Sequence, residues 1–156
     1  MAIRKPLVLT NGEIEQLQSG DTIDVQPDSY NATFTSTVIA GEPVYIDGAS
    51  SVDQAQATAG GTSEVAGLAA EAVTAASTGA VIFNGTVTLT TLEWDAVAGT
   101  TGGLTAGTKY YLSDAAAGRI VDQASIPTTA TRYVVELGEA LDATDLLLMI
   151  RRRIKL

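Results

Sequence analysis

The sequence predicts an all-β fold, a small β-barrel or sandwich preceded by an extended N-terminal arm. Turn signals rich in Gly, Asn, Asp and Ser recur roughly every 8–14 residues, and no segment shows the sustained periodicity of a long helix. The chain has 156 residues, the size of one ordinary domain. Small residues dominate its middle and only 5% of its residues are aromatic, as in chains of many short strands and turns.

Residues 1–36 are predicted to form the arm, and residues 37–156 the barrel or sandwich domain. Two turn signals, Asn11-Gly12 and Ser19-Gly20-Asp21, divide the arm into short pieces. The segment GEIEQLQ between them has a poor amphipathic pattern for a globular core. We therefore expect an extended segment with one or two short strands.

The next strands are built largely from small residues. The segment VYI precedes the turn Asp47-Gly48. Residues 64–73 (EVAGLAAEAV) fit a helical stripe, but glycines before and within the segment favour a strand. The segment AVIFNGTVTLT alternates and predicts a strand with one buried face. That face would hold Val81, Phe83, Gly85, Val87 and Leu89.

The last third predicts a short helical turn around Trp94, followed by four strands: TKYYLSD, GRIVDQ, TRYVVELGEAL and TDLLLMIRRRI. Within TKYYLSD, Tyr110 and Tyr111 must point to opposite faces of a strand. One ring can enter a core, and the other must face solvent or a partner. A small barrel with a core inside and a subunit interface outside suits this pair.

Residue types absent from the chain exclude several kinds of site. There is no cysteine and no histidine, which rules out a disulfide framework, a Cys-His or Ser-His-Asp catalytic group and an imidazole zinc site. No Asp-x-Asp-x-Asp-Gly calcium loop occurs. We expect no enzyme activity, no cofactor and no metal. No apolar run reaches the roughly 18–20 residues that span a bilayer, so we also expect no membrane partner and no Sec export.

Charge is distributed unevenly. The net charge is −9, from nine basic and eighteen acidic residues. Between Pro6 and Ile150 only three basic residues face all eighteen acidic ones, a net charge of −15. The tails, in contrast, are basic, which suggests docking on an acidic surface. Nucleic acid is not the partner expected, because the acidic body would repel phosphates.

Several stretches resemble structural proteins of tailed bacteriophages. They are GEPVYIDG, GLAAEAV, TGAVIFNG, GGLTAGTKYYLS and LGEALDATDLLLMI, with RKPLVLTNGEIEQLQSGDTI at the start. The order of the first stretches is similar to that in the small β-barrels of capsid decoration (cement) proteins. The tryptophan followed by GGL, G and YYLS also occurs in tail-fibre and baseplate-associated proteins. The resemblance covers most of the chain and implies a structural virion component.

The expected function is therefore non-catalytic binding to the outer surface of the assembled phage head, which would bridge capsomers and stabilise the shell. The protein would be made in the host cytoplasm. Its partners would be the major capsid protein and further copies of itself, in a homotrimer. The alternative is a tail-fibre or baseplate-associated protein that takes part in host attachment.

Three groups of residues are candidates for these contacts. The arm would meet capsid or neighbouring subunits, the aromatic residues would serve a subunit interface or the core, and the basic C-terminal segment would form a further interface. The groups are, in that order, Arg4, Lys5, Leu7, Leu9, Ile14 and Leu17; Trp94, Tyr110 and Tyr111; and Arg151, Arg152, Arg153 and Lys155.

Two competing chemistries use some of the same residues. Tyr110, Tyr111 and Trp94 could form a platform on which a sugar ring stacks, as in an adhesin. Glu93 and Asp95 flank Trp94 and are the best-spaced candidates for a glycosidase pair, which needs two carboxyl groups facing each other across a substrate. We expect structural roles in both cases.

Overall fold

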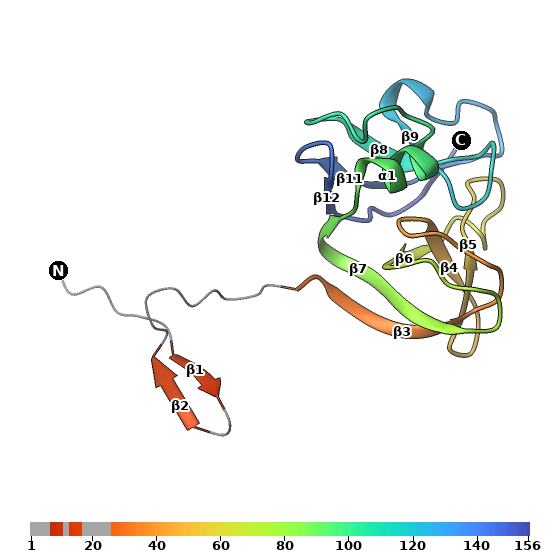
Figure 1. Cartoon of the computed structure of the whole chain (residues 1–156). Helices are drawn as coiled ribbons and strands as arrows, with labels where there is room; N and C mark the ends of the chain where they lie inside the picture. Colours follow the sequence, from red (N-terminus) through yellow and green to blue (C-terminus); the bar gives the residue numbers. More distant parts are fainter. Residues whose placement is uncertain (1–6, 11–12, 17–25) are drawn as a thin grey trace.

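The computed structural model describes residues 7–10, 13–16 and 26–156, and it confirms the predicted all-β fold (Figure 1). The first seven strands are β1 (Leu7–Thr10), β2 (Glu13–Gln16), β3 (Asp28–Phe34), β4 (Pro43–Gly48), β5 (Ser51–Gln54), β6 (Val65–Ala69) and β7 (Thr78–Thr88). The remaining elements are α1 (Thr91–Ala98), β8 (Lys109–Leu112), β9 (Ile120–Asp122), the 3-10 turn η1 (Gln123–Ser125), β10 (Tyr133–Val134), β11 (Glu136–Ala140), β12 (Asp145–Leu148) and β13 (Ile154–Lys155).

Five strands close into a barrel in the order β3-β5-β4-β6-β7, and β7 pairs again with β3. The β3–β5 pairing is parallel, and the other four are antiparallel. Closure leaves none of these strands as a free edge. Because β3 is one of the five, the barrel begins at Asp28, ahead of the boundary predicted at residue 36.

Small side chains fill the barrel. Along β3, Ala32 and Phe34 alternate with exposed residues, as expected for a strand with one buried face. The wall approaches so closely at Gly67 that a Cβ there would lie 2.4 Å from the Ile82 carbonyl oxygen. Only a narrow interior remains, and its buried residues are Ala32, Phe34, Val38, Val44, Val52, Ala69, Val73 and Val81.

Strand β7 belongs to two sheets. Its first part pairs with β3 and β6 in the barrel, and residues 85–88 pair with β12. A register shift opposite Asp28 and Ser29, followed by Gly85 at φ 102°, marks the change. A bulge of this kind reverses the alternation of the strand.

The predicted single buried face of β7 is therefore wrong. Val81 belongs to the barrel interior, whereas Ile82 and Val87 both belong to the second core. Phe83 lies where the alternation changes, is 43% exposed, and contacts the Tyr30 ring at a centroid distance of 6.1 Å.

The second part of the molecule is an open antiparallel sheet in the order β7-β12-β11-β8-β9, with α1 beside it (Figure 1). Helix α1 starts with a capping box between Thr90 and Glu93. Its C-terminal cap is Gly99, whose backbone adopts the left-handed conformation. It is longer than the single turn expected. Trp94 and Val97 bury its inner face in a core shared with Leu112, Leu137 and Leu148.

Two further predictions concern residues 64–73 and the C-terminal strand. The strand preference for residues 64–73 is confirmed by β6. The expected continuous strand through Leu146, Leu148 and Ile150 into the arginines is wrong. Strand β12 ends at Leu148, and the short β13 instead pairs with β10.

Strands β1 and β2 form a separate antiparallel pair in which Leu9 is opposite Ile14. Within the described residues, no helix has the length and apolar character required to cross a membrane.

Candidate interaction surfaces

The two adjacent tyrosines of β8 point to opposite faces of the sheet. Tyr110 is 1% exposed, and its hydroxyl oxygen accepts a hydrogen bond from the Thr105 N–H at 3.0 Å. Tyr111 is half-buried on the other face. Trp94 is fully buried, and its indole Nε1–H donates to the Thr144 carbonyl at 2.7 Å. Of the three rings, Tyr111 alone is accessible, so they do not form a sugar-stacking platform.

Glu93 and Asp95 each bind the backbone of a different segment. Glu93 accepts from the Thr90 N–H at 2.8 Å and completes the cap of α1. Asp95 accepts from the N–H groups of Gly103 at 2.7 Å and Gly102 at 2.9 Å. The pKa of Glu93 is lowered first by a hydrogen bond from the Thr90 hydroxyl, at 2.7 Å, and then by the bond from the Thr90 N–H. The pKa of Asp95 is lowered by the bonds from the Gly103 and Gly102 N–H groups. Residues two apart on a helix do not face each other, so this pair lacks the geometry of a glycosidase site.

Asp142 has a similar structural role in the turn before β12. Its Oδ1 accepts from the N–H groups of Thr144 at 2.7 Å and Asp145 at 2.9 Å, and these bonds lower its pKa. In the described part of the chain, no cluster of three or more acidic side chains could hold a metal ion.

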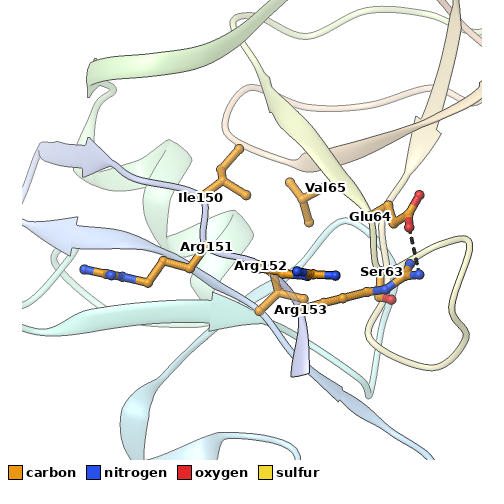
Figure 2. A pocket seen from close by; sticks show the side chains of 8 residues that line it. Ser63, Glu64, Val65, Ile150, Arg151, Arg152 and Arg153 are labelled. Atoms are coloured by element: carbon orange, nitrogen blue, oxygen red, sulfur yellow. Dashed lines mark ion pairs between the residues drawn. The ribbon is translucent and has the colours of Figure 1, made fainter. Parts of the chain in front are cut away.

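The C-terminal arginines lie at a cleft between the barrel and the second sheet. The cleft has a volume of about 430 Å³ and is lined by Ser63, Glu64, Val65, Val135, Ile150, Arg151, Arg152 and Arg153. Its residues come from the segment leading into β6, from the residue after β10, and from the chain after β12. Figure 2 shows Arg152 and Arg153 pointing toward Ser63 and Glu64, whereas Arg151 points the other way.

Two of the three arginines are paired within the chain. The Arg151 guanidinium Nε lies 3.1 Å from Glu136 Oε1, which also contacts Lys109 Nζ at 3.2 Å. Arg153 lies 2.7 Å from Glu64 Oε1, donates to the Gly60 carbonyl, and stacks over the Tyr133 ring at 5.5 Å. The Arg152 side chain is exposed and forms no ion pair with any described residue. The Lys155 side chain is likewise exposed.

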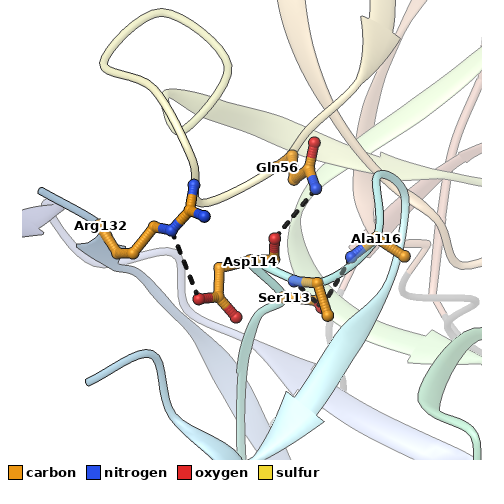
Figure 3. A network of polar contacts seen from close by, with 6 residues as sticks. Gln56, Ser113, Asp114, Ala116 and Arg132 are labelled. Carbon is orange, nitrogen blue, oxygen red and sulfur yellow. Dashed lines mark hydrogen bonds and ion pairs between the residues drawn. The ribbon is translucent and has the colours of Figure 1, made fainter. Parts of the chain in front are cut away.

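A polar network lies next to this region and fixes the loop after β8 (Figure 3). The Gln56 side-chain amide donates to the Asp114 carbonyl at 3.0 Å, and Arg132 lies 3.7 Å from the Asp114 carboxylate. Ser113 is buried, and its Oγ accepts from the Ala115 N–H at 3.1 Å. The Gln56–Asp114 hydrogen bond joins the barrel to the second sheet. Sequence reasoning missed it because its partners lie 58 residues apart in the chain.

Glu42 is a buried carboxyl group at the junction of the two parts. It is 4% exposed and accepts a hydrogen bond from the Gln54 side-chain amide at 2.8 Å. A Cβ at Gly118 would lie 2.9 Å from its Cδ, which shows how closely the β8–β9 loop covers it. Burial raises the pKa of Glu42, and the hydrogen bonds oppose this effect only in part.

An apolar groove of about 370 Å³ runs along α1. It is lined by Ile39, Ala40, Ala72, Thr90, Leu92, Glu93 and Ala96. Leu92 is 79% exposed at its rim. The weak amphipathic pattern of this short helix gave no sequence signal for the groove.

The predicted arm contacts cannot be placed on this surface. Arg4, Lys5 and Leu17 lie outside the described residues, as do the side chains of Leu7, Leu9 and Ile14. Their contact with capsid or neighbouring subunits stays a prediction.

Comparison with known proteins gives a structural likeness. No protein-family model and no curated protein matches the chain. Among solved structures, the chain is similar to one described as "The capsid of Myoviridae Phage XM1", with 19% sequence identity and a TM-score of 0.47. The alignment covers 88% of this chain and 93% of that one.

Proposed function

We propose that the protein is a non-catalytic decoration protein of a phage capsid, bound to the outer surface of the head. The observation that carries the proposal is the closed five-stranded barrel, which is the fold that the sequence resemblance implies. The engagement of Glu93 and Asp95 in backbone hydrogen bonds supports the non-catalytic part of the proposal.

Binding would combine several weak contacts. The N-terminal segment, with Leu7 and Leu9 in β1 and Ile14 in β2, would extend over neighbouring capsid subunits and add strand pairings. The barrel would bridge adjacent capsomers as a homotrimer, and Tyr111 would lie at an interface. Many such contacts on one shell raise the overall affinity by multivalency.

The test is co-sedimentation of the purified protein with isolated phage heads that lack it, with host cells in a parallel tube. We expect saturable binding to heads, a stoichiometry tied to shell symmetry, and no binding to cells. A variant without residues 1–20 should lose most of its head binding. Equal binding of the full chain and the shortened chain would reject the role of the arm.

Binding to cells or to tails, without binding to heads, would replace the proposal by a tail-associated role. Burial of Trp94 and Tyr110 weighs against that role in its adhesin form, because neither ring is available to a glycan. Hydrolysis of cell-wall glycan by the protein, abolished by Glu93→Gln, would replace both the decoration role and the tail-associated role by an enzymatic one. The engagement of Glu93 in the helix cap argues against that outcome.

A further inference from the structure

The apolar groove beside α1 has an acidic rim. Among the described residues that line it, none is basic, and Glu93 is one of them. Glu71 precedes the lining residue Ala72, is exposed, and forms no ion pair with any described residue. Leu92 and Ala96 supply an exposed apolar surface on the outer side of the helix. The groove is therefore suited to apolar side chains that are flanked by a positive charge.

Residues 154–156, at β13, have that combination. The side chain of Ile154 is 64% exposed, and that of Leu156 is 45% exposed. Positions two apart in an extended segment lie on the same side of it. Lys155, between them, and the nearby Arg152 are exposed and form no ion pair within the described part of the chain. This segment thus presents two large apolar side chains beside unpaired positive charge.

We propose that the groove beside α1 binds residues 154–156 of a second copy of the chain. The two apolar side chains of that segment pack against Leu92 and Ala96. The Lys155 ammonium group lies near the carboxylate of Glu71. The inference rests on the proposed homotrimer and names the contact that joins one subunit to the next.

Hydrogen bonds within the chain favour a second copy as the source of this segment. Strand β13 pairs with β10, and the Leu156 N–H donates to the Arg132 carbonyl at 3.0 Å. The Leu156 carbonyl accepts from the Thr131 N–H at 3.2 Å. None of these residues lines the groove. A chain that filled its own groove would have to break these bonds, whereas a second copy brings the segment with its bonds intact.

The groove and the segment are made of different residues, so each subunit can use both at once. Copies joined in this head-to-tail way close into a ring when the rotation between them allows it. In a homotrimer of this kind each subunit takes part in two such contacts. Burial of the apolar side chains supplies most of the affinity, because an exposed ion pair contributes little.

Disulfide cross-linking provides a direct test, because the chain has no cysteine of its own. One preparation carries Leu92→Cys, and the other carries Ile154→Cys on a chain lengthened by a tag. After mild oxidation of the mixture, we expect a disulfide-linked species of mixed size. The matched control replaces Leu92→Cys by Leu141→Cys, at an exposed leucine that does not line the groove. Cross-linking no stronger than in this control overturns the proposal. So does a cross-link that forms only within a chain carrying both cysteines.

Truncation of the apolar side chains tests the same contact without a covalent trap. Leu92→Ala and Ile154→Ala should each weaken self-association, measured by sedimentation velocity, by about tenfold. Both side chains are exposed, so the variants should keep the circular dichroism spectrum of the wild type. Leu141→Ala is the control and should leave self-association unchanged. Equal effects of the three substitutions, or a wild-type chain that stays monomeric, overturn the proposal.

Charge reversal tests the position of Lys155. Lys155→Glu and Glu71→Lys should each weaken self-association by about twofold to fivefold. A chain that carries both substitutions should associate as the wild type does, because every contact in the ring then regains an opposite pair. A double variant weaker than either single variant overturns the assigned contact.

Head binding separates this inference from the proposed function. Self-association that depends on Leu92 and Ile154, together with no binding to heads, would reject the decoration role alone. Binding to heads without cross-linking above the control would reject the subunit contact alone. Loss of head binding in Leu92→Ala, with self-association unchanged, would assign the groove to the capsid and overturn the proposal.

Discussion

The barrel and the helix-covered sheet bury apolar surface in two different ways. In the barrel, five strands satisfy one another's backbone groups, and the interior holds mainly alanine and valine around the single ring of Phe34. The open sheet instead buries large side chains, among them Trp94 and Tyr110, with α1 beside it. A closed sheet can thus be stable with small residues, whereas an open sheet depends on a few large ones. Because β7 runs through both parts, we expect them to unfold together.

The largest effect is expected from removing the large ring of the second core. Trp94→Ala leaves a cavity and should lower the free energy of unfolding by about 3–5 kcal/mol. Trp94→Phe removes the indole N–H that donates to the Thr144 carbonyl, which keeps its hydrogen bond from the Leu89 N–H, and it should cost about 1–3 kcal/mol through the lost bond and the smaller ring. Urea unfolding followed by circular dichroism measures both. Two separate transitions in Trp94→Ala, one for each part, would show that β7 does not couple them.

The stability of the barrel should be more sensitive to added side-chain atoms than to the loss of side-chain atoms. Gly67→Ala places a Cβ 2.5 Å from Val81 Cγ1 as well as against the Ile82 carbonyl, which the narrow wall cannot absorb. We expect a loss of about 1–3 kcal/mol in the free energy of unfolding. Gly61→Ala is the matched control, because nothing lies within 4 Å of its added Cβ. A loss equal to that of the control would mean that the barrel wall is not closely packed.

Glu42, at the junction of the two parts, and Asp95, on α1, should give opposite pH dependence of the free energy of unfolding. The pKa of Glu42 is raised in the folded chain, so the unfolded chain ionises first as pH rises above about 4.5. The Glu42 contribution to stability is therefore lost with rising pH. The pKa of Asp95 is lowered, so its contribution is present above about 3.8 and is lost as pH falls through the folded value.

Substitution separates the two effects in thermal unfolding measured across pH. Glu42→Gln should remove the decrease in thermal stability that Glu42 causes as pH rises above about 4.5. Asp95→Asn should lower the thermal stability at neutral pH and make it less dependent on pH under acidic conditions. The opposite pattern in either variant would show that the carboxyl group is in a different environment from the one described.

Sequence patterns predicted the individual strands better than the way in which the strands pair to close the barrel. Alternation was enough to place Tyr110 and Tyr111 on opposite faces, and the glycines before and within residues 64–73 were enough to favour a strand. The parallel β3–β5 pairing joins distant segments, and the bulge near Gly85 reverses a face without any change in hydrophobicity. Neither has a local signal.

The candidate surfaces show the same limit. The basic C-terminal segment is visible in the sequence, but its division into paired and unpaired arginines depends on Glu136 and Glu64, which only folding brings near. The acceptor for the Trp94 indole N–H, the Thr144 carbonyl, likewise comes from a segment 50 residues away in the chain. Charge was predictable, and its partners were not.

The smallest effect is expected where the two parts meet at the surface, and it distinguishes neighbouring arginines. Arg153→Ala removes the ion pair with Glu64 and the contact with the Tyr133 ring. It should lower the free energy of unfolding by about 1 kcal/mol, because the Arg153 and Glu64 side chains are partly exposed. Arg152→Ala should change the free energy of unfolding by less than about 0.5 kcal/mol, since it has no ion-pair partner to lose among the described residues. If urea unfolding gives Arg152→Ala the larger effect, Arg152 stabilises the monomer. Equal stability, combined with weaker self-association, would instead mean that Arg152 serves a neighbouring chain.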